Sequence, residues 1–451
     1  MTQNRALEIL NSGASIFLTG PPGSGKSYVL EQFVINARRI GKRLAVTATT
    51  GIAASLLGGA TIHSWSGLGV RQRLEPREIE YLIKDPCLFG RLNEVEILII
   101  DEISMLEAVT LDSLDALLKA ARSSFLPFGG IQVVLSGDFF QLPPVSKNPN
   151  PYCFLSKSWN EANLLVCYLS EQHRQLPDEL TEILTALRDQ RFNKYHLALL
   201  SARQNIAHPP LTVLMTHNKD VDSLNNQRLA KTSGRSKVYV GQLIGQPQIA
   251  NDLLRSVLAP KVLTLKVGAQ VMFVANDPLK RYVNGSQGRV VGFRHELPVI
   301  ELKENKSVIV AEAFSWKKEA DNRAAELIQI PLKLAWAITI HKCQGMSLDA
   351  ADIDLKRSFV SGMGYVALSR LKNYKGLYLR SYNSRSLELD RVVYGFDREL
   401  RKKSGLNELK SQNYSPRKMA HLLRRAGVKR QIIKQTTGLS DRQLGAILKH
   451  E

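Results

Sequence analysis

Residues 20–27, with the sequence GPPGSGKS, constrain the fold of this chain more than any other stretch. They match the pattern G-x-x-x-x-G-K-[ST], in which glycines allow backbone N–H groups to wrap around a phosphate. Residues 15–19 are expected to form a buried strand before the loop. Residues 28–39 are expected to form a helix after it, with apolar residues at Val29, Leu30, Phe33, Val34 and Ala37. This context predicts a phosphate-binding loop at a helix N-terminus rather than a chance glycine-rich turn.

The loop predicts which residues hold a nucleoside triphosphate and its metal ion. We expect Lys26 to reach the β- and γ-phosphates and Ser27 to hold Mg²⁺. The residues predicted to bind the nucleotide here are Gly20, Pro21, Pro22, Gly23, Ser24, Gly25, Lys26 and Ser27. The loop alone predicts nucleotide binding and does not reveal how the energy is used.

Two acids follow an apolar segment, residues 96–100, that reads as a second buried strand. At the tip of such a strand, Asp101 is expected to support Mg²⁺ through water, and Glu102 to take a proton from the attacking water. A pair of surface acids is the alternative interpretation. The phosphate loop upstream favours the catalytic one.

Three further polar residues are placed to sense or stabilise phosphate charge. Gln141 follows the predicted strand at 131–135 and is positioned like a γ-phosphate sensor. Arg174 follows a predicted strand at 164–169, and Arg370 begins a loop. Each guanidinium can fork to phosphate oxygens, although an isolated arginine is usually only solvated.

The segment that ends in Thr61, His63 and Trp65 combines hydroxyls, backbone amides and aromatic rings after a predicted strand. Such a group suits a phosphodiester backbone with one base stacked on Trp65. A hydroxyl-capped loop with Trp65 in the core is an equally good interpretation at this point.

The charge balance points to a polyanionic partner. The chain has 61 Lys and Arg residues against 41 Asp and Glu, a net charge of +20 and a pI of about 9.8. Nucleic acid is the first partner that this excess favours and an anionic membrane the second, while solubility alone is the alternative. The four cysteines include no C-x₂-C pair, so neither a zinc site nor a disulfide framework is indicated.

Cysteine usage, the apolar segments and the N-terminus together indicate the compartment that we expect. Cysteine usage suits a reducing environment, and no apolar run approaches the roughly 20 residues of a membrane span. No signal or transit peptide is recognisable before the loop. We expect a cytoplasmic protein of a cell without organelles, with a nuclear or phage protein as alternatives.

The order of patterns predicts an α/β protein with an insertion. A first α/β domain is expected over residues 1–168, with a small protruding wedge at 70–94. A second α/β domain is expected over 169–235 and 327–400. It is interrupted at 236–326 by short alternating strands that predict a small β-barrel.

Residues 401–451 form a basic tail with 13 Lys and Arg against three Asp and Glu, a net charge of +10. Three helices are expected, and Ser440 with Gln443 forms a capping box for the third. The spacing of apolar residues around Gly438 resembles a helix-turn-helix, although Lys434 stands where a small residue usually packs. A basic helical tail covering the motor is the alternative.

Several of these motifs, taken in order, resemble the Pif-type DNA helicases, a group related to the RecD-like helicases of superfamily 1. The resemblance covers roughly residues 1–395. The segments that carry it are QNRALE from Gln3, residues 20–27, TGIAA and GGATIHSW in 50–65, DEISM from Asp101, GDFFQLPP in 137–144, HRQ in 173–175, AITIHKCQG in 337–345 and YVALSR in 365–370.

The resemblance implies two tandem RecA-like motor domains, an SH3-like barrel inserted in the second, and ATP with Mg²⁺ as cofactors. It implies that Gln3 reads adenine and that Arg174 and Arg370 reach the phosphates from the second domain. It also implies an enzyme that moves 5′→3′ along single-stranded DNA and unwinds forked or 5′-tailed duplexes and G-quadruplexes. The residues expected to contact DNA or couple it to the ATP site are Thr61, His63, Trp65, Thr339, His341 and Lys342.

Departures from the family pattern occur at Met363, Gly364 and Cys343, and the wedge at 70–94 is short. The family's work lies in genome maintenance: repair, recombination, replication and telomere maintenance. We expect a monomer, with single-strand-binding or recombination proteins as further partners and no membrane association. The alternatives are a translocase that does not unwind, a conjugation or recombination subunit inactive without partners, and a binding module with a relic nucleotide site.

Overall fold

The computed structural model describes most of the chain. The described residues are 1–69, 71–146, 148–171, 178–279, 281–303, 305–320, 323–405, 415–425, 428 and 430–448. They divide into two compact units, Met1–Pro209 with Ser347–Glu451, and Pro210–Met346. The predicted domain boundaries, which divide the chain differently, stay predictions.

The first unit contains a six-stranded sheet whose pairings are all parallel. Its order is β3 (Ala60–Thr61), β2 (Leu44–Ala48), β4 (Ile97–Asp101), β5 (Gln132–Ser136), β1 (Ile16–Thr19) and β6 (Leu165–Tyr168). Each strand predicted in this region is present within a residue or two of its expected bounds. Because the strands are parallel, their carboxyl ends share one edge of the sheet.

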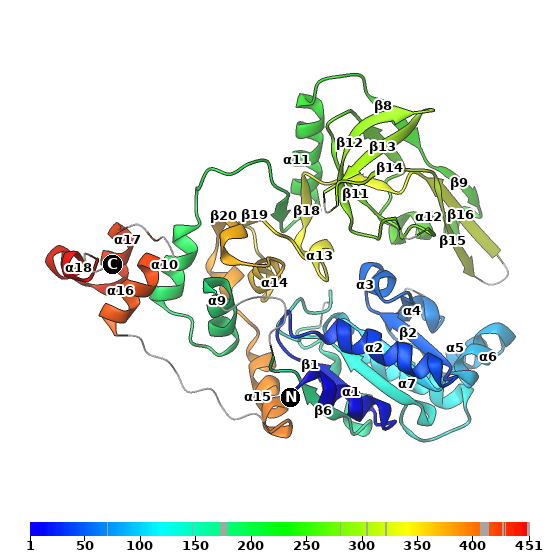
Figure 1. Cartoon of the computed structure of the whole chain (residues 1–451). Coiled ribbons are helices and arrows are strands. Elements are labelled where there is room, and N and C mark those ends of the chain that lie inside the picture. The colour runs from blue at the N-terminus through cyan, green and yellow to red at the C-terminus, as the bar shows by residue number, and fades with distance from the viewer. Residues whose placement is uncertain are drawn as a thin grey trace. The chain divides into compact units, whose positions relative to one another are not determined.

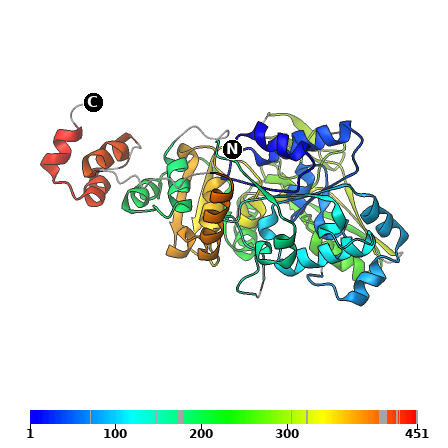
Figure 2. The ribbon, with the colours of Figure 1, turned by 90° about the horizontal axis from the view of Figure 1, so that it is seen from below.

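Helices supply the apolar cover of this sheet (Figure 1, Figure 2). Ile16 and Leu18 pack in one buried cluster with α1 and α2, while Phe17, between them, contacts Trp159 with ring centroids 5.0 Å apart. This alternation is the period of two expected for a strand buried on both faces. The helices before β6 are α1 (Gln3–Asn11), α2 (Lys26–Arg39), α3 (Gly51–Leu56), α4 (Ile62–Trp65), α5 (Pro76–Leu82), α6 (Pro86–Glu94), α7 (Ala108–Ala121) and α8 (Lys157–Glu161).

The rest of the first unit is mostly helical. Phe396 stacks on Phe154 with ring centroids 4.0 Å apart, which joins α15 to the core beside the sheet. Strands β19 and β20 pair in parallel. The elements are α9 (Glu179–Arg188), α10 (Lys194–Ala202), β19 (Ala351–Leu355), α14 (Met363–Ser369), β20 (Leu377–Tyr382), α15 (Arg391–Lys403), α16 (Pro416–Arg425), α17 (Arg430–Thr437) and α18 (Asp441–Leu448). Short 3₁₀ turns are η1 (Ile103–Met105), η2 (Pro127–Gly130), η3 (Cys153–Leu155), η4 (Tyr374–Gly376) and η5 (Ser384–Leu387).

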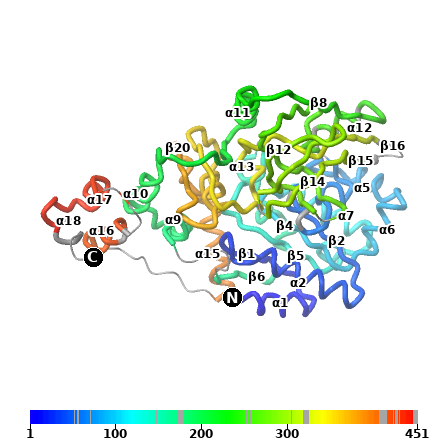
Figure 3. The backbone as a smooth tube through the Cα atoms, turned by 45° about the horizontal axis from the view of Figure 1, so that its top comes forward, coloured from blue at the N-terminus to red at the C-terminus, as the bar shows by residue number. Residues whose placement is uncertain are grey.

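The second unit is rich in antiparallel strands, and its path can be followed in Figure 3. One sheet has the order β14 (Val308–Val310), β13 (Leu297–Leu302), β12 (Gln287–Arg294), β11 (Gln270–Phe273) and β17 (Leu332–Leu334). Another has the order β15 (Phe314–Ala320), β16 (Arg323–Gln329) and β9 (Gln242–Gly245). The remaining elements are β7 (Val213–Met215), α11 (Asn218–Lys231), β8 (Lys237–Val240), α12 (Pro247–Ser256), β10 (Val262–Leu265), β18 (Ala337–Thr339) and α13 (Ile340–Cys343).

The inserted strands at 236–326 are present as predicted, but the sequence interpretation missed helix α12. Pro247 occupies its first turn, and Ala250 and Leu253 are buried in a cluster with Leu327 of β16. The apolar spacing of three to four residues was the signal for this helix. None of the described helices is long and apolar enough to span a membrane.

Candidate nucleotide and DNA sites

The predicted phosphate loop joins β1 to α2 at the carboxyl edge of the sheet. Gly20 and Gly25 have positive φ angles, +146° and +88°. A Cβ at Gly20 would lie 2.6 Å from the Leu169 carbonyl oxygen, so the close packing of this loop requires glycine. Helix α2 begins at Lys26, two residues earlier than predicted, and the side chain of Ser27 is exposed in its first turn.

Lys26 points into the loop. Its Nζ donates to the carbonyl oxygens of Gly20, at 2.9 Å, and Pro21, at 3.2 Å. Burial lowers the pKa of Lys26, and the carboxylates of Asp138 and Glu102 act against that shift. The loop hydroxyl of Ser24 is also buried and has no hydrogen-bond partner among the described residues. An ammonium group and an unpaired hydroxyl in one glycine loop fit a phosphate group.

Gln3 lies against the same loop, and its contact with adenine stays a prediction. Its Nε2 donates to the carbonyl oxygen of Ser24 at 3.2 Å, and a Cβ at Gly25 would lie 1.9 Å from that nitrogen. Helix α1 starts at Gln3 because Thr2 caps it by accepting from the backbone N–H of Arg5. The cap therefore sets the position of Gln3 relative to the loop.

The two predicted acids stand at the end of β4, which is separated in the sheet by β5 from β1, the strand that leads to the phosphate loop. Both are half-buried, and Glu102 has a left-handed backbone with φ of 53°. Burial raises the pKa of Asp101, and the charge of Lys26 opposes that rise. A non-glycine residue with positive φ is uncommon and often marks a functional turn.

No group of three or more His, Cys, Asp and Glu that could hold a metal ion occurs in the part of the chain that the structure describes. Mg²⁺ at Ser27 and Asp101 would therefore take its other ligands from phosphate and water, as Mg²⁺ commonly does.

The structure brings Gln141 and Arg370 together. Both side chains are buried, and Arg370 Nη2 lies 3.5 Å from Gln141 Oε1. Arg370 also donates through Nε to the Val366 carbonyl oxygen and through Nη2 to the Ser369 hydroxyl. These bonds hold the guanidinium at the end of α14, beside the predicted sensor.

The backbone at Gly362 approaches the backbone of residues 140 and 141 closely, which explains this pairing. Gly362, the residue before α14, has a φ of +84°. A Cβ there would lie 2.8 Å from the Phe140 carbonyl oxygen and 2.9 Å from that of Gln141. Phe139 and Phe140 are themselves buried, so they pack within the loop and do not present surfaces for stacking.

A buried arginine that the sequence interpretation missed lies in the same region. Arg188, at the end of α9, donates to both carboxylate oxygens of Asp138 at 2.7 and 2.8 Å. It also donates to the hydroxyls of Tyr365 and Tyr168, at 2.9 and 2.7 Å, and lies 3.3 Å from Asp397. Asp138 was visible only as part of the GDFFQ motif, and no local pattern marks Arg188.

The three predicted DNA-contact residues at the start of α4 and within it are only half-buried. Thr61 caps α4 by accepting from the backbone N–H of Ser64 at 3.3 Å. His63 and Trp65 are half-buried, so Trp65 lies outside the buried core. Burial lowers the pKa of His63 and so favours its neutral ring. The capped loop and the accessible ring are both present, and their contact with DNA stays a prediction.

The second predicted DNA segment belongs to the other unit. Thr339 is buried before α13, while His341 and Lys342 are half-buried on it. Burial, with a smaller contribution from His217, lowers the pKa of His341. Lys333 adds a cation to this region: burial and the neighbouring Lys342 lower its pKa to about 8. Two lysines forced together favour an anionic ligand.

The remaining predictions have mixed outcomes. Arg174 lies outside the described residues. Cys343, one departure from the family pattern, is buried and donates from Sγ to the Ile340 carbonyl oxygen, as a serine hydroxyl could. Met363 is fully buried, and a Cβ at Gly364 would lie 2.1 Å from the Ser386 carbonyl oxygen. All four cysteines are free.

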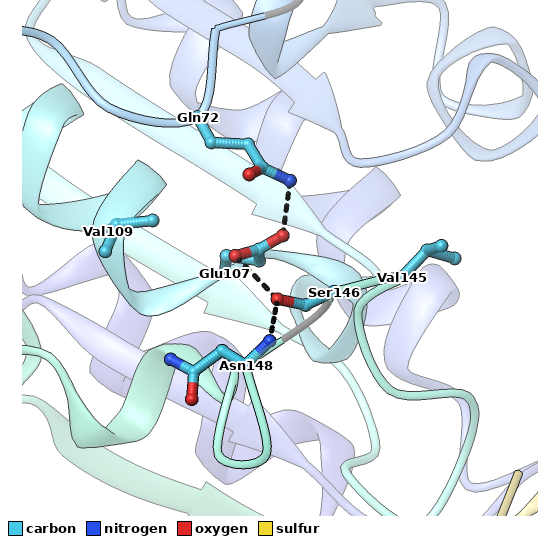
Figure 4. A pocket seen from close by; sticks show the side chains of 6 residues that line it. All are labelled: Gln72, Glu107, Val109, Val145, Ser146 and Asn148. Carbon is cyan, nitrogen blue, oxygen red and sulfur yellow. Dashed lines mark hydrogen bonds between the residues drawn. The ribbon is translucent and has the colours of Figure 1, made fainter.

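An open hollow of about 710 Å³ lies elsewhere on the first unit (Figure 4). Glu107 accepts hydrogen bonds there from Gln72 and from Ser146, the latter at 3.1 Å. None of the predicted nucleotide or DNA residues lines it. The lining residues are Gln72, Glu107, Val109, Val145, Ser146 and Asn148.

Comparison with known proteins places this site in a family. A family model described as PIF1-like helicase matches residues 3–205, and one described as the 2B domain of the DNA helicase Pif1 matches residues 248–293. The ATP-dependent DNA helicase Pif1 of Psychrobacter sp. (strain PRwf-1) is 39% identical, with 88% of this chain and 70% of that protein covered. The relative of the same name from Bdellovibrio bacteriovorus is 36% identical, with 87% and 90% covered.

The chain belongs to the PIF1-like helicase family. Among solved structures, Pif1 helicase from Candida albicans superposes with a TM-score of 0.81 at 33% identity, covering 88% of this chain and 98% of that one. Bacteroides sp. Pif1 in complex with ADP-AlF4 gives a TM-score of 0.70 at 28% identity, covering 90% and 98%. Bacteroides Pif1 bound to single-stranded DNA gives 0.67 at 29%, covering 91% and 98%.

Membership in the PIF1-like family confirms three predictions: the family itself, the α/β fold with two RecA-like domains, and the class of enzyme, an ATP-dependent DNA helicase. The same comparisons support the use of a nucleotide, because the named relatives are ATP-dependent. The roles of individual residues stay predictions, because no comparison tests them.

Proposed function

We propose that this chain moves 5′→3′ along single-stranded DNA by hydrolysing ATP at the loop of residues 20–27. The observation that carries the proposal is the convergence of Lys26, the acids after β4 and the Gln141–Arg370 pair in one unit. Phosphate binding, proton removal and charge stabilisation each have a candidate residue there.

The proposed roles follow from the surroundings of each side chain. Lys26 and the loop amides bind the β- and γ-phosphates, and Gln3 contacts the adenine edge. Ser27 and Asp101 hold Mg²⁺, which supplies Lewis-acid stabilisation of phosphate charge when bound. A divalent cation beside Asp101 favours its ionised form and so opposes the effect of burial.

The remaining groups act on the attacking water and the γ-phosphate. Glu102 accepts the proton from the water, and Gln141 senses the phosphate. Arg370 stabilises charge that develops in the transition state, together with Arg174. Closure on ATP and reopening after hydrolysis would move DNA held by Thr61, His63, Trp65, Thr339, His341 and Lys342.

The solved relatives support the choice of partner. Bacteroides Pif1 has been solved in complex with single-stranded DNA and with ADP-AlF4, and another Pif1 structure concerns unwinding at forked duplex DNA by two coordinating helicases. We propose single-stranded DNA and forked or 5′-tailed duplexes as partners of this chain, ATP and Mg²⁺ as cofactors, and action as a monomer in genome maintenance.

A strand-displacement assay tests the proposal. The full chain is given ATP, Mg²⁺ and duplexes that are 5′-tailed, 3′-tailed or blunt, with Lys26→Ala as the control that lacks the phosphate contact. We expect displacement only of the 5′-tailed substrate and none by the control. Displacement of the 3′-tailed duplex would contradict the polarity.

One alternative has an observation in its favour. The predicted wedge contains only two short helices, α5 of seven residues and α6 of nine. A motor with so small a wedge could move along DNA without separating strands. DNA-stimulated ATP hydrolysis without displacement of any tailed duplex would favour this translocase.

A further inference from the structure

The described part of the C-terminal tail forms a small helical module. Helix α16 packs against α17 and α18, and α10 contacts both α16 and α17. Five apolar side chains from these segments are buried: Ala420, Leu423, Val428, Ile433 and Leu444. The module lies beyond residues 3–205 and 248–293, to which the family models correspond.

The connection between α17 and α18 has the geometry of a helix-turn-helix. Helix α17 ends at Thr437 and α18 begins at Asp441, which leaves a turn of three residues. Gly438 has a φ of +68° and so allows the sharp change of direction. Ser440 and Gln443 form the predicted capping box: each backbone N–H donates to the other's side chain, at 2.9 and 3.3 Å.

The residue that departed from the helix-turn-helix pattern has a structural explanation. Lys434 is exposed, and its Nζ donates to the Asp441 carboxylate. Arg430 donates to the Asp441 backbone carbonyl at 3.0 Å. Two cations of α17 thus contact Asp441 at the start of α18.

The surface of this module is basic. Asp441 is the one acid in its described residues, and two basic side chains already contact it. Arg442, the next residue, is exposed in the first turn of α18. The exposed basic residues of the three helices are Arg417, Lys418, Arg424, Arg430, Lys434 and Arg442.

We propose that α16–α18 form a helix-turn-helix module that binds duplex DNA, with α18 in the major groove and Arg442 reaching the DNA. A helix fits the major groove, and the N-terminal residues of the second helix of such a motif face the base edges. The positive surface supplies the sequence-independent part of the affinity. This binding needs neither ATP nor the motor's contacts with single-stranded DNA, so it does not rest on the proposed mechanism.

Binding of the full chain to a blunt duplex, measured by fluorescence anisotropy over a range of salt concentrations, tests the module. We expect Arg442→Ala to weaken binding by roughly fivefold or more and to reduce the salt slope by about one. Arg39→Ala, which removes an exposed arginine at the end of α2, is the matched control and should change neither. ATPase activity stimulated by single-stranded DNA should be the same in all three proteins. Equal affinities and slopes for Arg442→Ala and the control would overturn the proposal.

Two further measurements separate this proposal from the helicase itself. Lys26→Ala should lose ATPase activity and keep its affinity for the blunt duplex, which shows that the module binds without the motor. Enrichment of sequences from a randomised duplex pool should give a preference that Arg442→Ala weakens. The absence of any preference in the unaltered chain would overturn the placement of α18 in the major groove.

Discussion

Two ion pairs of this chain have similar chemistry and opposite surroundings. Arg188 and Asp138 pair at 2.7 Å with side chains that are 4% and 1% exposed. Lys434 and Asp441 pair at the turn of the C-terminal module, with side chains that are 48% and 62% exposed. One pair lies beside the predicted γ-phosphate sensor, and the other holds two surface helices together.

Burial changes the effect of a charge in these two pairs. Burial acts to lower the pKa of Arg188, but the combined electrostatic effect of Asp138, Tyr168, Tyr365 and Asp397 outweighs it, and the pKa lies above its usual value. At the surface, the hydrogen bond from Lys434 lowers the pKa of Asp441, while water screens the pair. We therefore expect substitutions in the buried region to change activity or stability strongly, and substitutions at the C-terminal module to change stability little.

The largest effect should come from Arg370, the other buried arginine near the sensor. We expect Arg370→Ala to reduce kcat for DNA-stimulated ATP hydrolysis by about 10³-fold, because it removes a guanidinium that stabilises transition-state charge. Steady-state kinetics at saturating ATP measures this loss. Lys372→Ala, an exposed neighbour paired with Asp349, is the control and should retain activity. A loss of less than tenfold would contradict the role of Arg370.

The buried ion pair should dominate stability. Asp138→Ala leaves the Arg188 charge without its main partner, and we expect a loss of about 3–5 kcal/mol in the free energy of unfolding. Urea denaturation measures it. In the double variant Arg188→Met with Asp138→Leu both charges are absent, so the loss should be smaller. A double variant less stable than Asp138→Ala would mean that the charge is not the cause.

A pH-dependent effect of intermediate size is expected at Lys333. Its pKa is lowered to about 8 in the folded chain, so the unfolded chain binds more protons between that pH and about 10.5. Stability from this group therefore rises with pH across that window. We expect Lys333→Met to be more stable than the unaltered chain at pH 7, by about 1–2 kcal/mol, with the difference vanishing towards pH 10.

Urea midpoints measured from pH 7 to pH 10 check this sign. Lys333→Arg is the control because arginine stays charged across the range, so its stability should not gain from high pH at this site. A difference between Lys333→Met and the unaltered chain that grows with pH would contradict the proposed cause.

The smallest effect should come from the exposed pair. We expect Asp441→Asn to reduce stability only slightly, because surface ion pairs contribute little. Thermal melting at low and high salt measures it, and salt should shrink the difference further. A loss as large as that of Asp138→Ala would remove the contrast between the two regions.

Much of the nucleotide site could be predicted because its signals are local. Five apolar residues of α2 were expected to be buried, and all five are. The glycines of the loop and the acids after β4 each follow a strand within a few residues. Capping at Ser440 and Gln443 depends on a spacing of three, which is also readable from sequence.

Other parts could not be read in this way. Arg188 lies 50 residues from Asp138, 177 from Tyr365 and 209 from Asp397, so no local pattern links them. In the sequence, Lys434 stood out as a departure from the helix-turn-helix pattern. Its contact with Asp441 could not be seen there, because Asp441 lies on the other side of a turn. Helix α12 was missed for a different reason: its apolar spacing was present but was taken as part of a strand-rich segment.

From the sequence, residues 20–27 are predicted to bind a nucleoside triphosphate, because backbone geometry and the order strand, loop, helix are local properties. The folded structure shows which charges are buried together. It placed Arg370 beside Gln141 and Arg188 on Asp138, and it left Lys434 and Arg442 in solvent. The physical reason is that desolvation and pairing depend on segments far apart in the chain, which meet only when the core forms.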